Sequence, residues 1–358
     1  MPALILPIRR PRNDRPAMTA LGILVAVLAV ALVVTGGRPG VQTFATVFLG
    51  IFIEAMPFVL LGVLVSGVIG VFVRDETVER LLPRGRLTAP LVGSLLGMLF
   101  PVCECGVVPV TRRLLNKGAP VGLGVAFLFA SPVINPIVLW STYATFGGDW
   151  SMVALRAGLT LAVSVLVGVV FAFHPHPESL LKPAPAAMGY QPVILGEYTR
   201  GGAGRTAPRL APHTERERAT TPLREKVRAV CEHSAIEFFE MGKFLVFGAL
   251  LASLLQALIP RQTLLSVGQS PVRSVLVMIA LAVLLSVCST VDAFLVLTFA
   301  GSFTTGAVIA FLVFGPMVDI KSTLMFLTVF QRRAVALMIV LAAQLVLLAT
   351  VFINLNFA

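Results

Sequence analysis

Long apolar stretches separated by short polar turns form the main pattern along the chain. A membrane-spanning helix needs about 20 apolar residues, and stretches of roughly that length recur from one end of the sequence to the other. The pattern predicts an all-α, polytopic integral membrane protein with about nine membrane segments. These stretches cover approximately residues 18–36, 44–73, 87–110, 118–145, 152–173, 236–258, 272–300, 303–330 and 334–356.

The segment between the fifth and sixth stretches differs in composition. Residues 174–235 are rich in Pro, Gly, Thr and Arg, and such a segment buries too little apolar surface to fold by itself. We therefore expect a cytoplasmic linker there, with a helical pattern that resumes near Glu225. The expected organisation is an N-terminal tail with the first transmembrane helix (1–43), membrane repeat 1 (44–173), the linker (174–235) and membrane repeat 2 (236–358).

The two membrane halves repeat each other in sequence. Three pairs of similar segments lie 184 to 186 residues apart, a constant spacing that chance rarely gives. Duplicated halves with breaks at corresponding positions are typical of secondary transporters, so we predict two structural repeats that are inverted in the membrane. The pairs are FIEAMPFVLLGVLVSG (52–67) with FFEMGKFLVFGALLAS (238–253), FPVCECG (100–106) with LSVCSTV (285–291), and AFLFASPVINP (126–136) with AFLVFGPMVDI (310–320).

Prolines and glycines interrupt these apolar segments at matching places. Backbone groups freed by a helix break find no water in hydrocarbon, so breaks are tolerated where they line a protein cavity. We therefore predict broken or re-entrant helices near the bilayer midplane. The residues expected to break or shape them are Pro101, Gly106, Pro132, Pro136, Gly315 and Pro316.

Polar residues cluster at the same breaks and predict a substrate site. An ionisable group at membrane depth is costly and usually faces a partner or a cavity, while thiolates prefer soft metals and metalloids. The expected substrate-binding residues are Cys103, Glu104, Cys105 and Asn135 from the first half, with Cys288, Asp292 and Asp319 from the second. Glu54, Glu240 and Lys321 are expected to serve in coupling or pairing.

Plainer roles remain open for several of these residues. The cysteines can be small packing residues, Asp319 can cap a half-helix, and Lys321 can extend to a membrane interface. Asp319 and Lys321 are two residues apart and do not face each other on a regular helix. An irregular backbone after Gly315-Pro316 would still allow them to pair.

Charge helps to predict topology. The chain carries a net charge of +11, yet the positive residues concentrate in tails and loops, which favours topology signals and anionic lipid over nucleic acid. If 87–110 and 272–300 are re-entrant hairpins that turn at Cys103 and Cys288, the basic loop 112–117 and the linker lie inside. If every stretch spans, the linker lies outside. We favour the re-entrant arrangement, because it agrees with the positive-inside bias.

Other function classes lack their motifs. The sequence is 57% hydrophobic and has a mean hydropathy of +0.93, which excludes an ordinary soluble protein. It contains no GxxxxGK[ST] loop, no HExxH motif and no recognisable Ser/His/Asp set. Its four irregularly spaced cysteines form no disulfide framework. We expect neither an enzyme nor a bound metal or cofactor.

Four motifs resemble a known family. They are FIEAMPFVLLG (52–62), FPVCECGVVPVTRRLLNKG (100–118), ASPVINPIV (130–138) and FGPMVDIKSTL (314–324). Outside the linker, the chain from residue 44 onward resembles the UPF0718-type predicted permease family that includes the ArsP organoarsenical efflux permeases. The resemblance implies export of trivalent organoarsenicals, with recognition by Cys103, Cys105 and Cys288.

Together these features predict a permease that exports a small solute across the inner (plasma) membrane. The solute is expected to be a trivalent organoarsenical or another soft metalloid species, driven by the proton gradient. The expected partners are this solute and the lipid bilayer, with homo-oligomerisation left open. The alternatives are a non-transporting membrane anchor or subunit of a larger complex, and a permease for an unrelated small solute.

Overall fold

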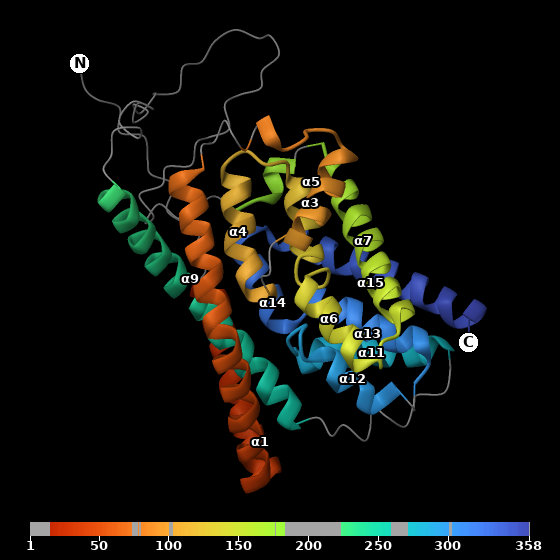
Figure 1. Ribbon diagram of the computed structural model, residues 1–358. Coiled ribbons are helices and arrows are strands. Elements are labelled where there is room, and N and C mark those ends of the chain that lie inside the picture. Colours follow the sequence, from red (N-terminus) through yellow and green to blue (C-terminus); the bar gives the residue numbers. More distant parts are fainter. Residues whose placement is uncertain are drawn as a thin grey trace.

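The computed structural model is built of helices throughout the part of the chain that it describes (Figure 1). Five helices are long and apolar enough to cross a membrane, and three shorter apolar helices accompany them within the described residues. The chain is therefore a multi-pass membrane protein. The described residues are 15–73, 78, 80–99, 103–175, 177–182, 223–258, 271–300 and 303–357.

The helices follow the predicted apolar stretches, but several stretches are divided in two. Stretch 87–110 contains α3 and the start of α4, and stretch 118–145 contains α5 and α6. The helices are α1 (Arg15–Phe72), α3 (Thr88–Leu99), α4 (Glu104–Asn116), α5 (Val121–Ala130), α6 (Pro136–Thr145), α7 (Trp150–Ala172), the short 3₁₀ helix η1 (Pro177–Leu180), α9 (Leu223–Leu258), α11 (Pro271–Leu285), α12 (Asp292–Ala300), α13 (Thr305–Met317), α14 (Ile320–Val329) and α15 (Arg332–Phe357).

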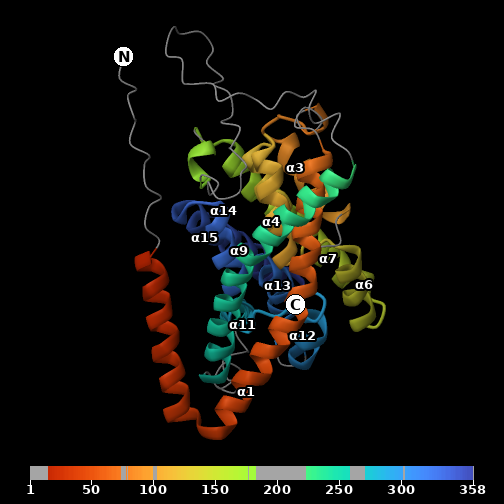
Figure 2. The ribbon, with the colours of Figure 1, turned by 90° about the vertical axis from the view of Figure 1, so that its left-hand side faces the viewer.

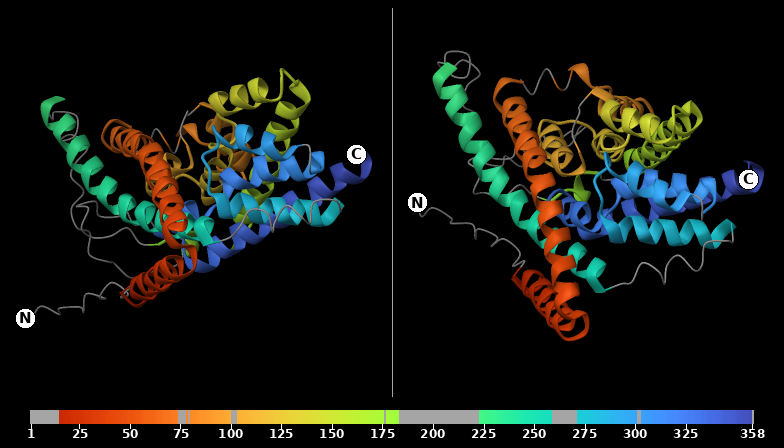
Figure 3. Two further views of the ribbon diagram at one scale, coloured as in Figure 1. Left: turned by 90° about the horizontal axis from the view of Figure 1, so that it is seen from below. Right: turned by 60° about the horizontal axis from the view of Figure 1, so that its bottom comes forward.

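Helix α1 contains both of the first two predicted segments. Gly37 has a positive φ of 53° and interrupts the helical backbone, a conformation that costs glycine little because it has no Cβ. The chain turns back on itself at this point (Figure 2). The second part of α1, residues 39–72, then lies side by side with α9 along one face of the molecule (Figures 1 and 3).

In the first half, α3 and α4 form a helical hairpin. Helix α4 runs in the same direction as α1, because Gly62 packs against Gly106 while Lys117 Nζ donates to the Val73 carbonyl at 2.7 Å. Helix α3 starts at that same end, where Ala89 packs in one apolar cluster with Ala119. Both ends of the hairpin therefore lie at what we call the Val73 end of the bundle.

Helix α9 starts at the Val73 end and runs away from it. Ser234 Oγ donates to the Val63 carbonyl at 3.0 Å, and later along α9 Gly248 packs against the backbone of Lys321. Helix α14 runs in the opposite direction to α9. Lys321 near the start of α14 packs against Gly248, whereas Thr328 further along α14 donates from Oγ1 to the sulfur of Met241, which comes earlier in α9, at 3.7 Å. Helices α13 and α14 together form one broken span, so Thr304, just before α13, lies at the other end of the bundle.

In the second half, α11 and α12 form a hairpin that enters from this Thr304 end. The start of α11 lies beside the start of α13, where the hydroxyls of Ser274 and Thr304 are 3.0 Å apart. Helix α12 returns to the same end, because Ala300 lies four residues before Thr304. The two hairpins therefore begin and end at opposite ends of the molecule.

The predicted break residues have different local roles. Pro132 lies in the break between α5 and α6, whereas Pro136 is the first residue of α6, where a missing N–H costs nothing. Gly315 and Pro316 lie in the last turn of α13, before the break at Val318 and Asp319. Pro101 lies outside the described residues.

Gly106 does not make the turn that the sequence suggested. It lies within the first turns of α4, and its position is explained by close packing. A Cβ on Gly62 would lie 2.5 Å from the Gly106 Cα, so glycine at both positions lets the two backbones approach.

The expected linker, 174–235, is partly described. Helix α9 begins at Leu223, before the expected boundary at residue 236. At the other end of the segment, the Lys182 N–H donates to Val329 O and the Gln331 N–H donates to Leu180 O, both at 2.8 Å. The start of the segment is therefore attached to the connection between α14 and α15.

Candidate functional site

A small cavity lies where the tips of the two hairpins meet α1. Its volume is about 10 Å³, roughly the space that one water molecule requires. The residues that line it come from both halves of the chain: Ile51, Glu54, Ala55, Phe58, Cys103, Glu104, Cys105, Cys288 and Lys321.

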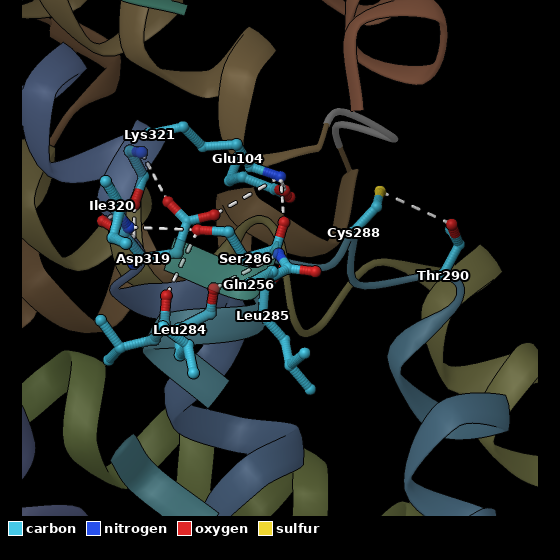
Figure 4. A network of polar contacts seen from close by, with 12 residues as sticks. Glu104, Gln256, Leu284, Leu285, Ser286, Cys288, Thr290, Asp319, Ile320 and Lys321 are labelled. Atoms are coloured by element: carbon cyan, nitrogen blue, oxygen red, sulfur yellow. Dashed lines mark hydrogen bonds and ion pairs between the residues drawn. The ribbon is translucent and has the colours of Figure 1, made fainter. Parts of the chain in front are cut away.

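Figure 4 shows a buried ion cluster formed by Glu104, Asp319 and Lys321. Glu104 and Lys321 of this cluster line the cavity. Lys321 Nζ lies 2.9 Å from Glu104 Oε1 and 3.4 Å from Asp319 Oδ2, and it also donates to the Ser286 carbonyl at 2.9 Å. One ammonium thus faces two buried carboxylates. Glu104 Oε2 is buried and has no hydrogen-bond partner among the described residues, although a buried charge is costly without one.

Helix capping places Lys321 in this cluster. The Asp319 side chain accepts from the Ser322 N–H while the Ser322 hydroxyl accepts from the Asp319 N–H, a reciprocal capping box that starts α14. The Ile320 N–H donates to Ser286 Oγ at 3.2 Å. Asp319 therefore takes both roles left open by the sequence, since it caps a half-helix and pairs with Lys321.

Three buried cysteines line the same cavity. Cys103 precedes α4, Cys105 lies in its first turn, and Cys288 lies in the break before α12. Thr290 Oγ1 contacts Cys288 Sγ at 3.6 Å. Cys231 is exposed and does not line the cavity. Within the described residues, no group of three or more His, Cys, Asp or Glu side chains is arranged to hold a metal ion.

Asp319 contacts the cavity residue Lys321 but does not itself line the cavity, and two further predicted substrate-binding residues lie outside it. Asn135 instead caps α6, where its Oδ1 accepts from the Ile137 N–H at 3.0 Å. Asp292 begins α12 and pairs with Arg156, with Nη2 to Oδ2 at 2.6 Å and Nη1 to Oδ1 at 3.1 Å. Both side chains are engaged at helix starts, so the expected convergence of all seven residues is only partial.

Arg156 is a buried residue that the sequence reasoning missed. Its side chain is fully buried in α7 and also donates to Thr142 Oγ1 at 2.8 Å. It connects the first half of the chain to Asp292 in the second. The signal was present, because a single arginine within the apolar helix Trp150–Ala172 must find a partner.

A second group of charges joins α4 to α1 and α9 near the Val73 end. Arg112 Nη1 pairs with Glu240 at 3.0 Å, and Arg113 Nε donates to the Ser66 carbonyl at 3.2 Å. The Ser66 hydroxyl contacts Glu237 at 2.8 Å. Arg112 and Arg113 were expected in a basic loop, but they are buried in α4, because acceptors on α1 and α9 satisfy them.

Comparison with known proteins identifies the family. A family model described as "Predicted permease" (ArsP_1) matches residues 41–355. UPF0718 protein YcgR of Bacillus subtilis is 43% identical over 309 residues, which cover 86% of this chain and 96% of the relative. A Streptococcus mutans protein named "Putative two-component membrane permease complex subunit" is 34% identical over 287 residues, covering 80% of this chain and 87% of that protein.

More distant similarity is limited to part of the chain. UPF0718 protein YraQ of Escherichia coli is 25% identical over 114 residues, which cover 32% of this chain and 33% of the relative. No solved structure matches the chain. The family match spans both hairpins and the cavity between them, and the chain therefore belongs to the UPF0718-type predicted permease family.

Proposed function

We propose that this protein is a secondary transporter that exports a small solute across the inner (plasma) membrane, through the cavity between the two hairpin tips. The observation that carries the proposal is the meeting of two hairpins from opposite ends at one buried set of thiols and charges. Both halves contribute to this set, with Cys103 and Glu104 from the first and Cys288 and Lys321 from the second. A purely structural anchor would not need such costly groups at membrane depth.

The fold supports two inverted repeats over 44–173 and 236–358. Helices α3 and α4 correspond to α11 and α12, α5 and α6 to α13 and α14, and α7 to α15. The hairpins enter from opposite ends. The break between α13 and α14 lies next to the first half's hairpin tip, where Lys321 pairs with Glu104, and Ser141 of α6 donates to the Thr290 carbonyl at the second half's tip. This arrangement is the one that inverted-repeat transporters use to place a site at the midplane.

The three thiols support a soft solute as substrate. Sulfur ligands favour soft metals and metalloids over hard cations, and Cys103, Cys105 and Cys288 all border the cavity. A trivalent organoarsenical is the solute that combines this chemistry with the family resemblance. The cavity of about 10 Å³ holds no such solute, so binding requires α1 or the hairpin tips to move apart.

The charge cluster supports coupling to protons. Lys321 balances one carboxylate, while the cluster contains both Glu104 and Asp319. Asp319 receives further hydrogen bonds from its helix cap, whereas Glu104 Oε2 has no partner among the described residues. A proton on Glu104 balances the cluster, and its release to one side of the membrane can drive solute movement.

Uptake into everted membrane vesicles tests the proposal. Vesicles that contain the wild-type protein should accumulate trivalent organoarsenicals from a panel of arsenicals, metals and small organic solutes. Replacing Cys103, Cys105 or Cys288 by Ser should abolish this uptake at unchanged protein level. Cys231→Ser is the matched control and should transport normally, because Cys231 is exposed and outside the cavity.

Normal uptake by the three cavity variants would refute the metalloid assignment and leave the thiols as packing residues. A second candidate function is a subunit of a two-component permease, which the name of the Streptococcus mutans relative favours. Reconstitution of the purified chain alone into liposomes separates the two, since a lone subunit would fail to transport.

A further inference from the structure

Three apolar side chains are exposed along one face of α12 and on the residue that precedes it. Val291, Phe294 and Leu297 are 44%, 55% and 48% exposed, and we call this set the α12 face. The other side of the helix is packed, since Asp292, Ala293 and Val296 are buried. Helix α12 is thus covered on one side only.

The repeat-equivalent face of α4 is covered. At the offset of 185 residues, the counterparts of the α12 face are Gly106, Pro109 and Arg112, and all three are buried. Each is in contact with α1 or α9. Gly106 packs against Gly62, the Pro109 carbonyl accepts from Ser66 Oγ at 3.3 Å, and Arg112 pairs with Glu240 at 3.0 Å.

The other pair of half-helices shows the same difference. A Cβ on Gly248 of α9 would lie 2.6 Å from the Lys321 Cα in α14, so the two backbones are in close contact. The counterpart of Lys321 at the offset of 184 residues is Ile137, which lies in α6 and is 56% exposed. Lys321 itself is buried.

Helices α1 and α9 therefore pack against α4 and α14, and they leave the equivalent faces of α12 and α6 uncovered. Gly62 and Gly248 are themselves counterparts, at the offset of 186 residues. Two halves that match in the order of their helices, but carry different residues on these faces, thus make different contacts with α1 and α9. This is the difference expected if the halves exchange conformations.

We infer that the α12 face, together with Ile137, is the docking surface for α9 and α1 in a second state of the protein. In that state Gly248 packs against Val291 and Gly62 packs against Ile137, while the contacts of α4 and α14 with the two long helices open. The inference rests on the proposed transport function and its inverted repeats. In this inference, the cavity opens toward the Val73 end when the ion pair between Arg112 and Glu240 breaks.

The occupant of this surface follows from complementarity. Burying Val291, Phe294 and Leu297 against a helix removes no hydrogen bond, and α9 offers small residues at the matching positions, Gly248 and Ala252. Lipid and a second copy of the chain are the competing occupants. A photoreactive group at this surface would form a product within the chain if α9 occupies it, a product with lipid if lipid occupies it, and a product between two chains if a second copy occupies it.

Photo-cross-linking tests the inference in the full-length protein in native membranes. Benzoylphenylalanine replaces Phe294, and in a control protein it replaces Phe352, which is 61% exposed on α15. Irradiation at position 294 should give an intramolecular product within α9, in the peptide around Ala252, identified by tandem mass spectrometry. Position 352 should give no product with α9.

Weakening the present state should raise the yield. Arg112→Gln removes a part-buried ion pair, which shifts the equilibrium by about fivefold, and Glu240→Gln provides an independent second variant. The α9 product at position 294 should increase by about that factor in both. Products with lipid alone in all backgrounds, or products between two copies, would overturn the inference.

The cross-linking result can be distinguished from the result of the transport assay that tests the proposed function. Cross-linking needs no substrate, so an incorrect solute assignment leaves it unchanged. Conversely, full transport by the Phe294 derivative without any α9 product refutes the second state alone.

Discussion

Among the ion groups that join the halves of the molecule, the two most deeply buried differ in a way that separates stability from function. Arg156 and Asp292 match one cation with one carboxylate, away from the cavity. Lys321 faces both Glu104 and Asp319 at the cavity wall. The balanced pair leaves no charge to exchange, whereas the unbalanced cluster can take up or release a proton. A balanced buried pair therefore indicates a structural link, and an imbalance beside a cavity indicates chemistry.

The largest expected effect follows from breaking the balanced pair. Arg156→Met leaves Asp292 buried without its partner, and losing one member of a buried pair costs about 3–5 kcal/mol. The variant should show a much lower free energy of unfolding in detergent, measured by denaturant titration. The double variant Arg156→Met/Asp292→Leu should recover most of the loss, and failure to recover would show that Arg156 acts through other contacts.

Removing the cation of the unbalanced cluster should affect transport more than folding. Lys321→Met and Arg156→Met both leave carboxyl groups that can become protonated, but Arg156→Met also removes the hydrogen bond to Thr142 Oγ1 and the larger side chain. The loss of stability should therefore be smaller in Lys321→Met. Transport per folded protein should be abolished, because no counter-charge remains to drive proton release. Vesicle uptake normalised to folded protein measures this, and transport at the wild-type rate would remove Lys321 from the mechanism.

Two substitutions at Asp319 separate its cap from its charge. Asparagine caps a helix about as well as aspartate, whereas alanine loses the cap and costs about 1 kcal/mol. Asp319→Asn should therefore keep near-wild-type stability but impair transport of every substrate. Asp319→Ala should lose both, and equal transport by wild type and Asp319→Asn would assign Asp319 to capping alone.

The smallest effect is expected at Asp149, an exposed cap that serves as a reference. Its side chain accepts hydrogen bonds at Ser151, including one from the Ser151 N–H at 2.8 Å, and these bonds lower the pKa of Asp149. The depressed pKa contributes stability above the unfolded pKa, near 4, and this contribution is lost as pH falls through the folded pKa. Asp149→Asn should thus match wild type in transport at neutral pH. Its free energy of unfolding should be slightly lower than that of wild type at neutral pH, and this difference should disappear as the pH falls below the folded pKa of Asp149. A transport defect at neutral pH would show that the cap has a further role.

Much of the architecture could be predicted from the sequence, because its signals are local. The length of the apolar stretches predicts the membrane segments. As expected, Pro132 lies at the break between α5 and α6, and Asp319 lies at the break between α13 and α14. The spacing of the matched segments also located Cys103 and Cys288, which share the cavity. Membrane segments and helix breaks are determined by the residues of the segment itself and by the surrounding lipid, so they can be recognised in a single sequence.

Contacts between distant segments could not be predicted in the same way. Asn135 and Asp292 were assigned to the cavity because they are polar residues near breaks, but a helix start and Arg156 engage them. Arg156 and Asp292 are 136 residues apart, and no local pattern specifies such a pair. Whether a buried polar group binds a ligand or a neighbour is decided by packing that the sequence does not display.

The close backbone contacts at two glycines also bear on how this protein can vary. A Cβ at Gly62 or Gly248 would lie 2.5 Å or 2.6 Å from a main-chain atom, whereas Gly50 has nothing within 4 Å of its Cβ position. In a library containing every amino acid at every position, Gly62 and Gly248 should accept almost no replacement while Gly50 accepts many. Substitutions accepted during evolution should therefore fall elsewhere in α1 and α9, because any side chain at Gly62 or Gly248 would collide with a neighbouring backbone even if it is hydrophobic.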